Sequence, residues 1–122
     1  MSELKITPET QQILMELQAY QQQMQTVLIQ KESLSIQNME MDKALVELGK
    51  VKDEDVFKAV GPILIKADKE KLKIELNERK ETIDLRLKSL NKQEKRMKDR
   101  MEENQKKLEE ILKGHEKKSA AE

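Results

Sequence analysis

Residues 55–66 read DVFKAVGPILIK, and strand character is concentrated in this one segment. Its β-branched and aromatic residues flank a Gly-Pro pair, a pattern typical of a β-hairpin. The pattern predicts two short strands, Val56–Val60 and Ile63–Lys66. Gly61 supplies the positive φ that a tight reversal needs, and Pro62 belongs at the turn because it has no amide hydrogen to donate. The sequence does not determine the type of turn.

Both faces of this hairpin are expected to be apolar. Alternation along the first strand places Phe57 and Ala59 on one face and Val56 and Val60 on the other. A lone two-stranded hairpin is marginal in water and leaves two open edges. We therefore expect another chain to cover it, through an oligomerisation surface formed by Val56, Phe57, Ala59, Val60, Gly61, Ile63, Leu64 and Ile65.

The composition excludes an ordinary globular core. Only Tyr20 and Phe57 are aromatic, and 39% of the residues are charged. The abundant Glu, Lys, Leu, Gln and Met residues recur with a helical period, which favours long helices or a coiled coil over disorder. We expect residues 1–122 to form a single, mainly α domain.

A first helix is predicted over residues 7–49. The Thr-Pro-Glu sequence at 7–9 encodes its start, because it combines a capping hydroxyl, a proline at the first helical position and a carboxylate near the positive end of the dipole. Gly49 is predicted to cap its end. Polar Lys31 and Asn38 interrupt the apolar row and are expected to set register or to weaken the seam at a tolerable cost. The apolar row, which we call the seam, is Ile13, Leu17, Tyr20, Met24, Val27, Leu34, Met41, Leu45 and Leu48.

A second helix is predicted over residues 68–113. Asp68 starts it, Gly114 is predicted to cap it, and residues 114–122 are expected to be a flexible tail. Its seam has two rows at a spacing of seven: Leu76, Ile83, Leu90, Met97, Asn104 and Ile111, with Leu87, Glu94, Met101 and Leu108. Acidic and basic residues four apart are expected to support its outer face: Glu75–Arg79, Asp84–Lys88, Glu94–Lys98, Glu102–Lys106, Glu103–Lys107 and Glu109–Lys113.

Two helices of similar length with matching seams should fold back on each other. The predicted fold is a long antiparallel two-helix coiled-coil hairpin with a small β-hairpin between the helices. This arrangement brings the two chain ends together at one end of the coiled coil.

With these elements in place, the chain resembles the prefoldin family, and its β-type subunits of archaeal kind in particular. The likeness covers nearly the whole chain. It rests on the Gln-rich run at 18–25, KAL at 43–45 with Glu47, VFK at 56–58, VG at 60–61, ILIK at 63–66, Lys69-Glu70, LRL at 85–87 and Gln93-Glu94. The chain has a single predicted hairpin and in this respect is similar to the β-type subunits, since α-type subunits carry a second hairpin.

The resemblance implies a holdase that works without ATP and without a cofactor. In that family, two α-type and four β-type subunits pool their hairpins into an intersubunit β-barrel, and the resulting heterohexamer passes unfolded client proteins to a group II chaperonin. Clients are captured at the distal tips of the coiled coils. In this chain the tips correspond to the paired chain ends.

Apolar residues widen the seam near both ends of the chain. They are Leu4, Ile6, Ile13, Leu14, Leu17, Leu108, Ile111 and Leu112. Exposed Leu and Ile on splayed helix ends suit a non-specific grip on apolar segments. The alternative is that the Ile-Leu pairs merely complete the coiled coil. The resemblance favours substrate contact.

Other classes of function fit the sequence less well. Three scattered glycines and a single His give neither a phosphate loop nor a clustered catalytic site, so we expect no enzyme activity. A nucleic-acid-binding arm would use Lys88, Lys92, Lys95, Arg96, Lys98 and Arg100, but nearly every lysine has an acidic neighbour. A structural coiled-coil scaffold explains the seams and leaves the hairpin without a purpose. No apolar run approaches the ~18 residues of a membrane span, and no signal peptide or cysteine is present, so a cytoplasmic protein is expected.

Overall fold

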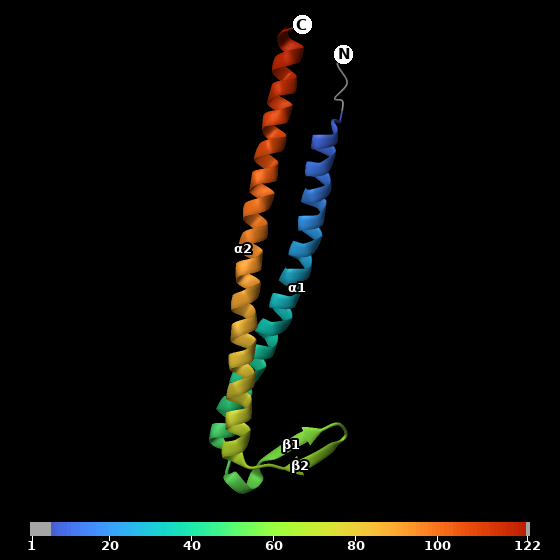
Figure 1. Cartoon of the computed structure of the whole chain (residues 1–122). Helices are drawn as coiled ribbons and strands as arrows, with labels where there is room; N and C mark the ends of the chain where they lie inside the picture. The colour runs from blue at the N-terminus through green and yellow to red at the C-terminus, as the bar shows by residue number, and fades with distance from the viewer. Residues whose placement is uncertain (1–5, 122) are drawn as a thin grey trace. The chain divides into compact units, whose positions relative to one another are not determined.

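The computed structural model describes the backbone of residues 6–121 and the side chains of residues 6–114. It consists of helix α1 (Pro8–Lys50), the short 3₁₀ helix η1 (Asp53–Asp55), strands β1 (Phe57–Val60) and β2 (Ile63–Lys66), and helix α2 (Lys69–Ala121) (Figure 1). The fold is therefore mainly α, with two long helices and a small antiparallel β-hairpin between them, as the sequence predicted.

The chain divides into two compact units. We call the described parts of Met1–Ile29 and Asn91–Glu122 the terminal unit, and Gln30–Leu90 the hairpin unit. Each unit contains a segment of α1 and a segment of α2. The hairpin unit also contains the two strands.

Both helices begin at side-chain caps. The Thr7 hydroxyl accepts a hydrogen bond from the Thr10 amide at 3.1 Å, directly before α1. The Asp68 carboxylate accepts one from the Lys71 amide at 3.1 Å, directly before α2. A cap of this kind satisfies one of the orphan amides of the first turn and stabilises a helix by about 0.5–2 kcal/mol.

The helix ends differ from the prediction. Gly49 lies inside α1, which ends at Lys50, and α2 continues through Gly114 to Ala121. The predictions that these two glycines cap their helices, and that the second helix ends at residue 113, are therefore wrong. Glycine permits a left-handed cap but does not force one. Within a helix it costs about 1 kcal/mol relative to alanine, which the well-formed turns around it can absorb.

The seams follow the predicted rows. Every predicted seam residue of both helices is buried or half-buried, including Lys31, Asn38, Glu94 and Asn104. In the terminal unit the buried side chains are Thr10, Ile13, Val27, Met97 and Asn104. In the hairpin unit they are Leu48, Val56, Ile83 and Leu90.

Polar side chains join the two helices within each unit. In the terminal unit, the Asn104 amide donates to Glu16 at 3.2 Å and the Arg100 guanidinium donates to the Tyr20 hydroxyl at 3.4 Å. In the hairpin unit, the Asn38 amide donates to Asp84 at 3.0 Å. Cross-helix bonds of this kind fix which residues of the two seams lie opposite each other.

Strands β1 and β2 pair in the order Phe57 with Lys66, Lys58 with Ile65, Ala59 with Leu64 and Val60 with Ile63. Gly61 adopts φ 57°, the positive value expected of it. Strand β1 begins at Phe57, one residue later than predicted. Val56 has an extended backbone, and its side chain is only 4% exposed and belongs to the core. Its carbonyl accepts the Ala67 amide at 3.0 Å, which closes the base of the hairpin.

Candidate functional site

The β-hairpin carries a dense set of exposed apolar side chains. All five large apolar residues of the two strands are exposed: Phe57, Val60, Ile63, Leu64 and Ile65. Leu64 is the most open of them, at 72%. The register places Phe57, Ala59, Leu64 and Lys66 on one face and Lys58, Val60, Ile63 and Ile65 on the other. Clustered apolar exposure of this kind marks an interaction surface.

The edges of the hairpin are also open. The sheet has two strands, which pair only with each other in the part of the chain that the structure describes. The outer edge of each strand therefore presents backbone donors and acceptors that a further strand can pair with. Apolar faces and open edges together are what strand-mediated assembly requires. Apart from Val56, the hairpin residues singled out from the sequence are all exposed, on the two faces of this hairpin and at its turn.

A cluster of charged residues lies where the hairpin meets α2. The Lys58 ammonium donates to both carboxylate oxygens of Glu75, at 2.8 and 3.0 Å. The Arg79 guanidinium lies 3.3 Å from the same carboxylate. The hydrogen bond from Lys58 lowers the pKa of Glu75 below its ordinary value, and the charge of Arg79 acts in the same direction. Sequence analysis predicted the Glu75–Arg79 pair but missed Lys58, whose partner is 17 residues away and is not revealed by helical spacing.

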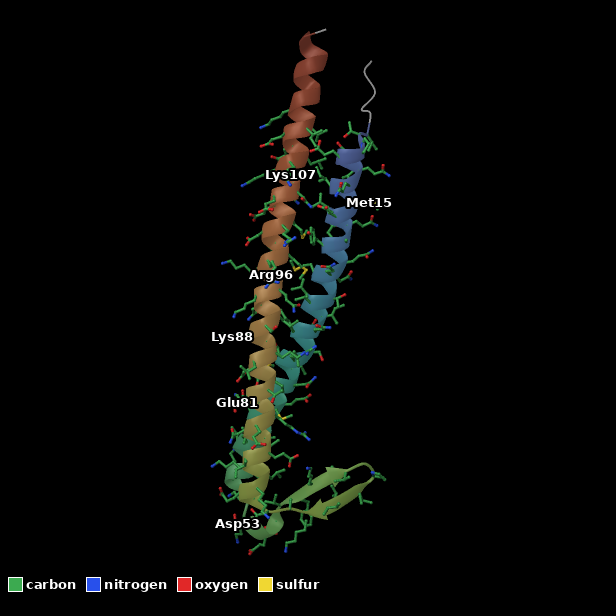
Figure 2. All side chains as sticks on the ribbon, viewed as in Figure 1. Met15, Asp53, Glu81, Lys88, Arg96 and Lys107 are labelled. Atoms are coloured by element: carbon green, nitrogen blue, oxygen red, sulfur yellow. The ribbon has the colours of Figure 1, made fainter. Side chains whose placement is uncertain are left out.

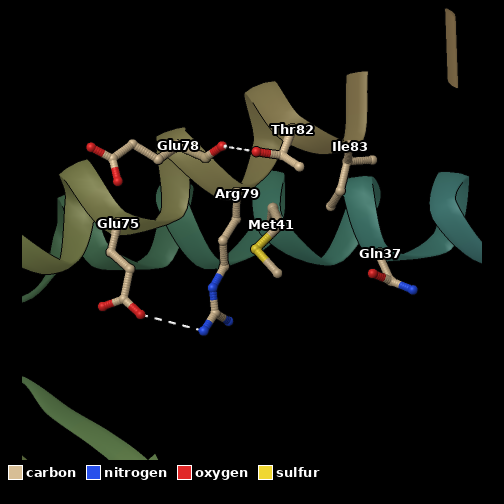
Figure 3. A pocket seen from close by; sticks show the side chains of 7 residues that line it. All are labelled: Gln37, Met41, Glu75, Glu78, Arg79, Thr82 and Ile83. Atoms are coloured by element: carbon tan, nitrogen blue, oxygen red, sulfur yellow. Dashed lines mark hydrogen bonds and ion pairs between the residues drawn. The ribbon is translucent and has the colours of Figure 1, made fainter. Parts of the chain in front are cut away.

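A shallow hollow lies beside this cluster in the hairpin unit. Gln37 and Met41 from α1 and Glu75, Glu78, Arg79, Thr82 and Ile83 from α2 line it (Figure 3). Its polar groups are largely engaged with each other, since the Thr82 hydroxyl donates to the Glu78 carbonyl at 3.1 Å and Glu75 binds Arg79. Within the described residues, no group of three His, Cys, Asp or Glu side chains is arranged to hold a metal ion.

The predicted tip residues fall into two sets. Ile13 is buried, and Leu17, Leu108 and Ile111 are half-buried along the seam. Ile6, Leu14 and Leu112 are exposed. Leu4 lies outside the described residues. The exposed set leaves an apolar surface near both chain ends, while the seam set holds the two helices together.

Sequence analysis gave no role to one further exposed residue of this region. Met15 lies on α1 (Figure 2), where it lines a shallow hollow with Pro8, Gln11, Gln12, Glu16 and Ala19. The sequence could have indicated this exposed position, because Met15 follows Leu14 and lies outside the seam. A flexible thioether adapts to partners of varied shape.

Two of the six basic residues considered for a nucleic-acid-binding arm are engaged within the chain. Lys98 lies 3.1 Å from Glu94, and Arg100 donates to Tyr20, which raises the pKa of the Arg100 guanidinium. A row of basic groups opposed by acidic neighbours is a poor match to a phosphate backbone. Neither helix, over its described length, has an apolar stretch that could cross a bilayer.

These features define a class of protein: two long helices joined by an exposed, apolar β-hairpin. Comparison with known proteins narrows the class. A family model described as prefoldin subunit matches residues 11–115. The prefoldin subunit beta of Archaeoglobus fulgidus is 41% identical over 109 residues, which cover 88% of this chain and 94% of that protein.

Two further similar proteins belong to the same family. The prefoldin subunit beta of Pyrococcus furiosus is 39% identical over 108 residues, covering 88% of this chain and 92% of that protein. The crystal structure of the prefoldin beta subunit from Thermococcus strain KS-1 matches with a TM-score of 0.81 and 35% identity, covering 90% of this chain and 97% of that one. The chain belongs to the prefoldin family of chaperone subunits.

Proposed function

We propose that this chain is a β-type holdase subunit that assembles through its hairpin and grips unfolded proteins near its chain ends. Four such chains combine with two α-type subunits in a cytoplasmic heterohexamer. The assembly binds clients without ATP and without catalysis, and passes them to a group II chaperonin.

The observation that carries the proposal is the exposed apolar hairpin. A surface with five open apolar side chains and two free edges is unfavourable in water and favours aggregation unless another chain covers it. Pairing with the hairpins of other subunits closes the edges and buries the faces together. The solved structure that this chain resembles and its sequence relatives are all named as prefoldin beta subunits, which supports this use of the surface.

Client binding is assigned to the apolar groups near the chain ends. Ile6, Leu14 and Leu112 are exposed there, and Met15 adds a flexible apolar group. These side chains present apolar area without a shaped, polar pocket, so they select for exposed hydrophobic segments and not for one sequence.

Assembly can be tested by changing the most open hairpin residue. Leu64→Ser removes an apolar side chain from the proposed interface, and we expect native mass spectrometry with a purified α-type prefoldin subunit to show loss of the hexamer. The matched control is Leu85→Ser, because Leu85 is similarly exposed, at 64%, but lies on α2 outside the hairpin. The control should assemble as the unmodified chain does.

The same experiment separates the chaperone from a coiled-coil scaffold. A scaffold would associate through its helices, so Leu64→Ser would leave its oligomeric state unchanged. Assembly that survives this substitution, or an unmodified chain that binds no α-type subunit, contradicts the proposal.

A further inference from the structure

Lys58 ties the hairpin to α2 through the charged cluster described above. Its ammonium makes two hydrogen bonds to Glu75. Arg79 binds the same carboxylate from one turn further along α2 (Figure 3). Lys58 and Glu75 are far apart in sequence, one on a strand and one on a helix. Their bond therefore constrains how the strand is oriented against the helix, which a pair within one helix cannot do.

The hairpin also meets the helices at its base, where Val56 and Phe57 line a hollow with residues of α1 and α2. Val56 is buried and its carbonyl accepts a hydrogen bond from the Ala67 amide. This bond joins the segment that enters the hairpin to the segment that leaves it. A single closed base still allows the strands to swing about it. Among the described strand residues, Lys58 is the one whose side chain bonds to a helix, so it is the restraint that acts beyond the base.

The position of Lys58 also determines which face of the hairpin is bonded to α2. Side chains alternate across a strand, and Lys58 shares its face with Val60, Ile63 and Ile65. On the opposite face, Phe57 lines a hollow with Leu72 and Leu76 of α2, whereas Ala59 and Leu64 lie further along the strands toward the turn. Leu64 is the most exposed side chain of the hairpin.

We propose that Lys58, Glu75 and Arg79 form a latch that orients the hairpin before assembly and presents its Leu64 face to the hairpin of another prefoldin-family subunit. The inference rests on the proposed function for the identity of the partner, but not for the latch itself. A hairpin that is already oriented loses less conformational freedom on binding than one that swings, so the latch favours association.

The expected size of the effect is modest. Lys58 and Glu75 are both partly open to solvent, and ion pairs of that kind contribute little individually. The two hydrogen bonds to one carboxylate and the second cation place this pair at the stronger end of that range. We expect loss of the pair to loosen the hairpin about two- to fivefold.

The exchange rates of the hairpin amides in the full-length, unassembled chain measure how firmly the latch holds the hairpin. Lys58→Met keeps most of the apolar length of the side chain and removes its charged end. We expect the amides of strands β1 and β2 to exchange about two- to fivefold faster. Glu75→Gln should also make the hairpin amides exchange faster. The double variant should exchange no faster than either single variant, since both substitutions disrupt the same interaction between Lys58 and Glu75. Lys58→Arg retains the charge and should restore slow exchange.

The matched control is Lys80→Met. Lys80 lies in the same unit and bonds to Asp42, but it does not contact the hairpin. Its loss should leave the hairpin amides unchanged. If Lys58→Met exchanges like the unmodified chain, if Lys80→Met loosens the hairpin equally, or if the two effects at Lys58 and Glu75 simply add, the latch is wrong.

Association with a purified α-type prefoldin subunit gives the second readout. We expect Lys58→Met to associate more weakly than the unmodified chain, by a factor similar to the change in exchange. Equal association would overturn the part of the inference that links the latch to assembly. If the unmodified chain does not associate at all while Lys58→Met still loosens the hairpin, the proposed function fails and the latch stands.

Discussion

Single polar residues determine how the helices and the hairpin meet. Asn104 occupies a seam position where Leu or Ile would bury more apolar area, yet it is buried and bonds to Glu16 of the other helix. Asn38 occupies an equivalent place and bonds to Asp84, while its side-chain oxygen is buried without a partner. An unpaired buried oxygen costs about 1–3 kcal/mol. Such residues lower the stability of a coiled coil and favour one register over others.

Glu75 makes the stability of the hairpin unit depend on pH. Its pKa is lowered from 4.5, first by the hydrogen bond from Lys58 and also by the charges of Lys58 and Arg79. The folded chain therefore binds this proton less readily than the unfolded chain. The stabilisation is fully present above the unfolded value near 4.5 and is lost as the pH falls through the lowered pKa.

We expect the free energy of unfolding of the unmodified chain to exceed that of Glu75→Gln at neutral pH. The difference should shrink as the pH falls below 4.5. Urea unfolding of both chains over a series of pH values measures it. A difference that stays constant down to the most acidic point would contradict the role assigned to the Glu75 carboxylate.

At the scale of the elements, the course of the helices followed from the sequence more fully than their ends did. The helical spacing located positions that are all buried or half-buried, because burial in a two-helix pair follows the helical period. It missed Thr10, which is buried one step before Ile13. The caps at Thr7 and Asp68 lie at the predicted starts, since the side chain itself supplies the missing acceptor. The helix ends that were predicted at Gly49 and Gly114 are wrong, because a glycine caps a helix only if the residues beyond it leave the helix.

The site was predictable in part for similar reasons. Strand propensity and the Gly-Pro pair located the hairpin, and alternation assigned Phe57 and Ala59 to one face. The core position of Val56 and the bond from Lys58 to Glu75 depend on how the hairpin sits against the helices. That orientation is a tertiary property, and no local pattern in the sequence encodes it.

Replacing two glycines separates a helical glycine from a turn glycine. Gly114 lies within α2 with open space around it, so Gly114→Ala should stabilise the helix by up to about 0.8–1.0 kcal/mol. Gly61 has φ 57°, a conformation that alanine adopts only with strain, so Gly61→Ala should destabilise the hairpin. Circular dichroism during thermal unfolding measures both. A loss of helicity in Gly114→Ala would show that α2 does not continue through this residue.

At the scale of the whole molecule, the chain keeps two apolar surfaces in two separate units. The hairpin residues belong to the hairpin unit, and Leu14, Met15 and Leu112 belong to the terminal unit. Each unit has its own buried seam residues and its own polar bonds between helices. Substitutions more than about 7–10 Å apart that share no partner act independently on stability, so we expect assembly and client binding to be separable by mutation.

The pair Leu14→Ser and Leu112→Ser tests that separation. Both side chains are exposed, so their removal should leave the free energy of unfolding and hexamer assembly nearly unchanged, within about 0.5 kcal/mol for stability. Aggregation of a chemically unfolded client, followed by light scattering with the variant in a complete hexamer, should increase. Leu28→Ser is the matched control, because Leu28 is exposed to a similar extent as Leu14, at 46% and 42%, but lies in the middle of α1. If the double variant suppresses aggregation as well as the control does, clients are bound elsewhere, and the exposed leucines near the chain ends serve the coiled coil alone.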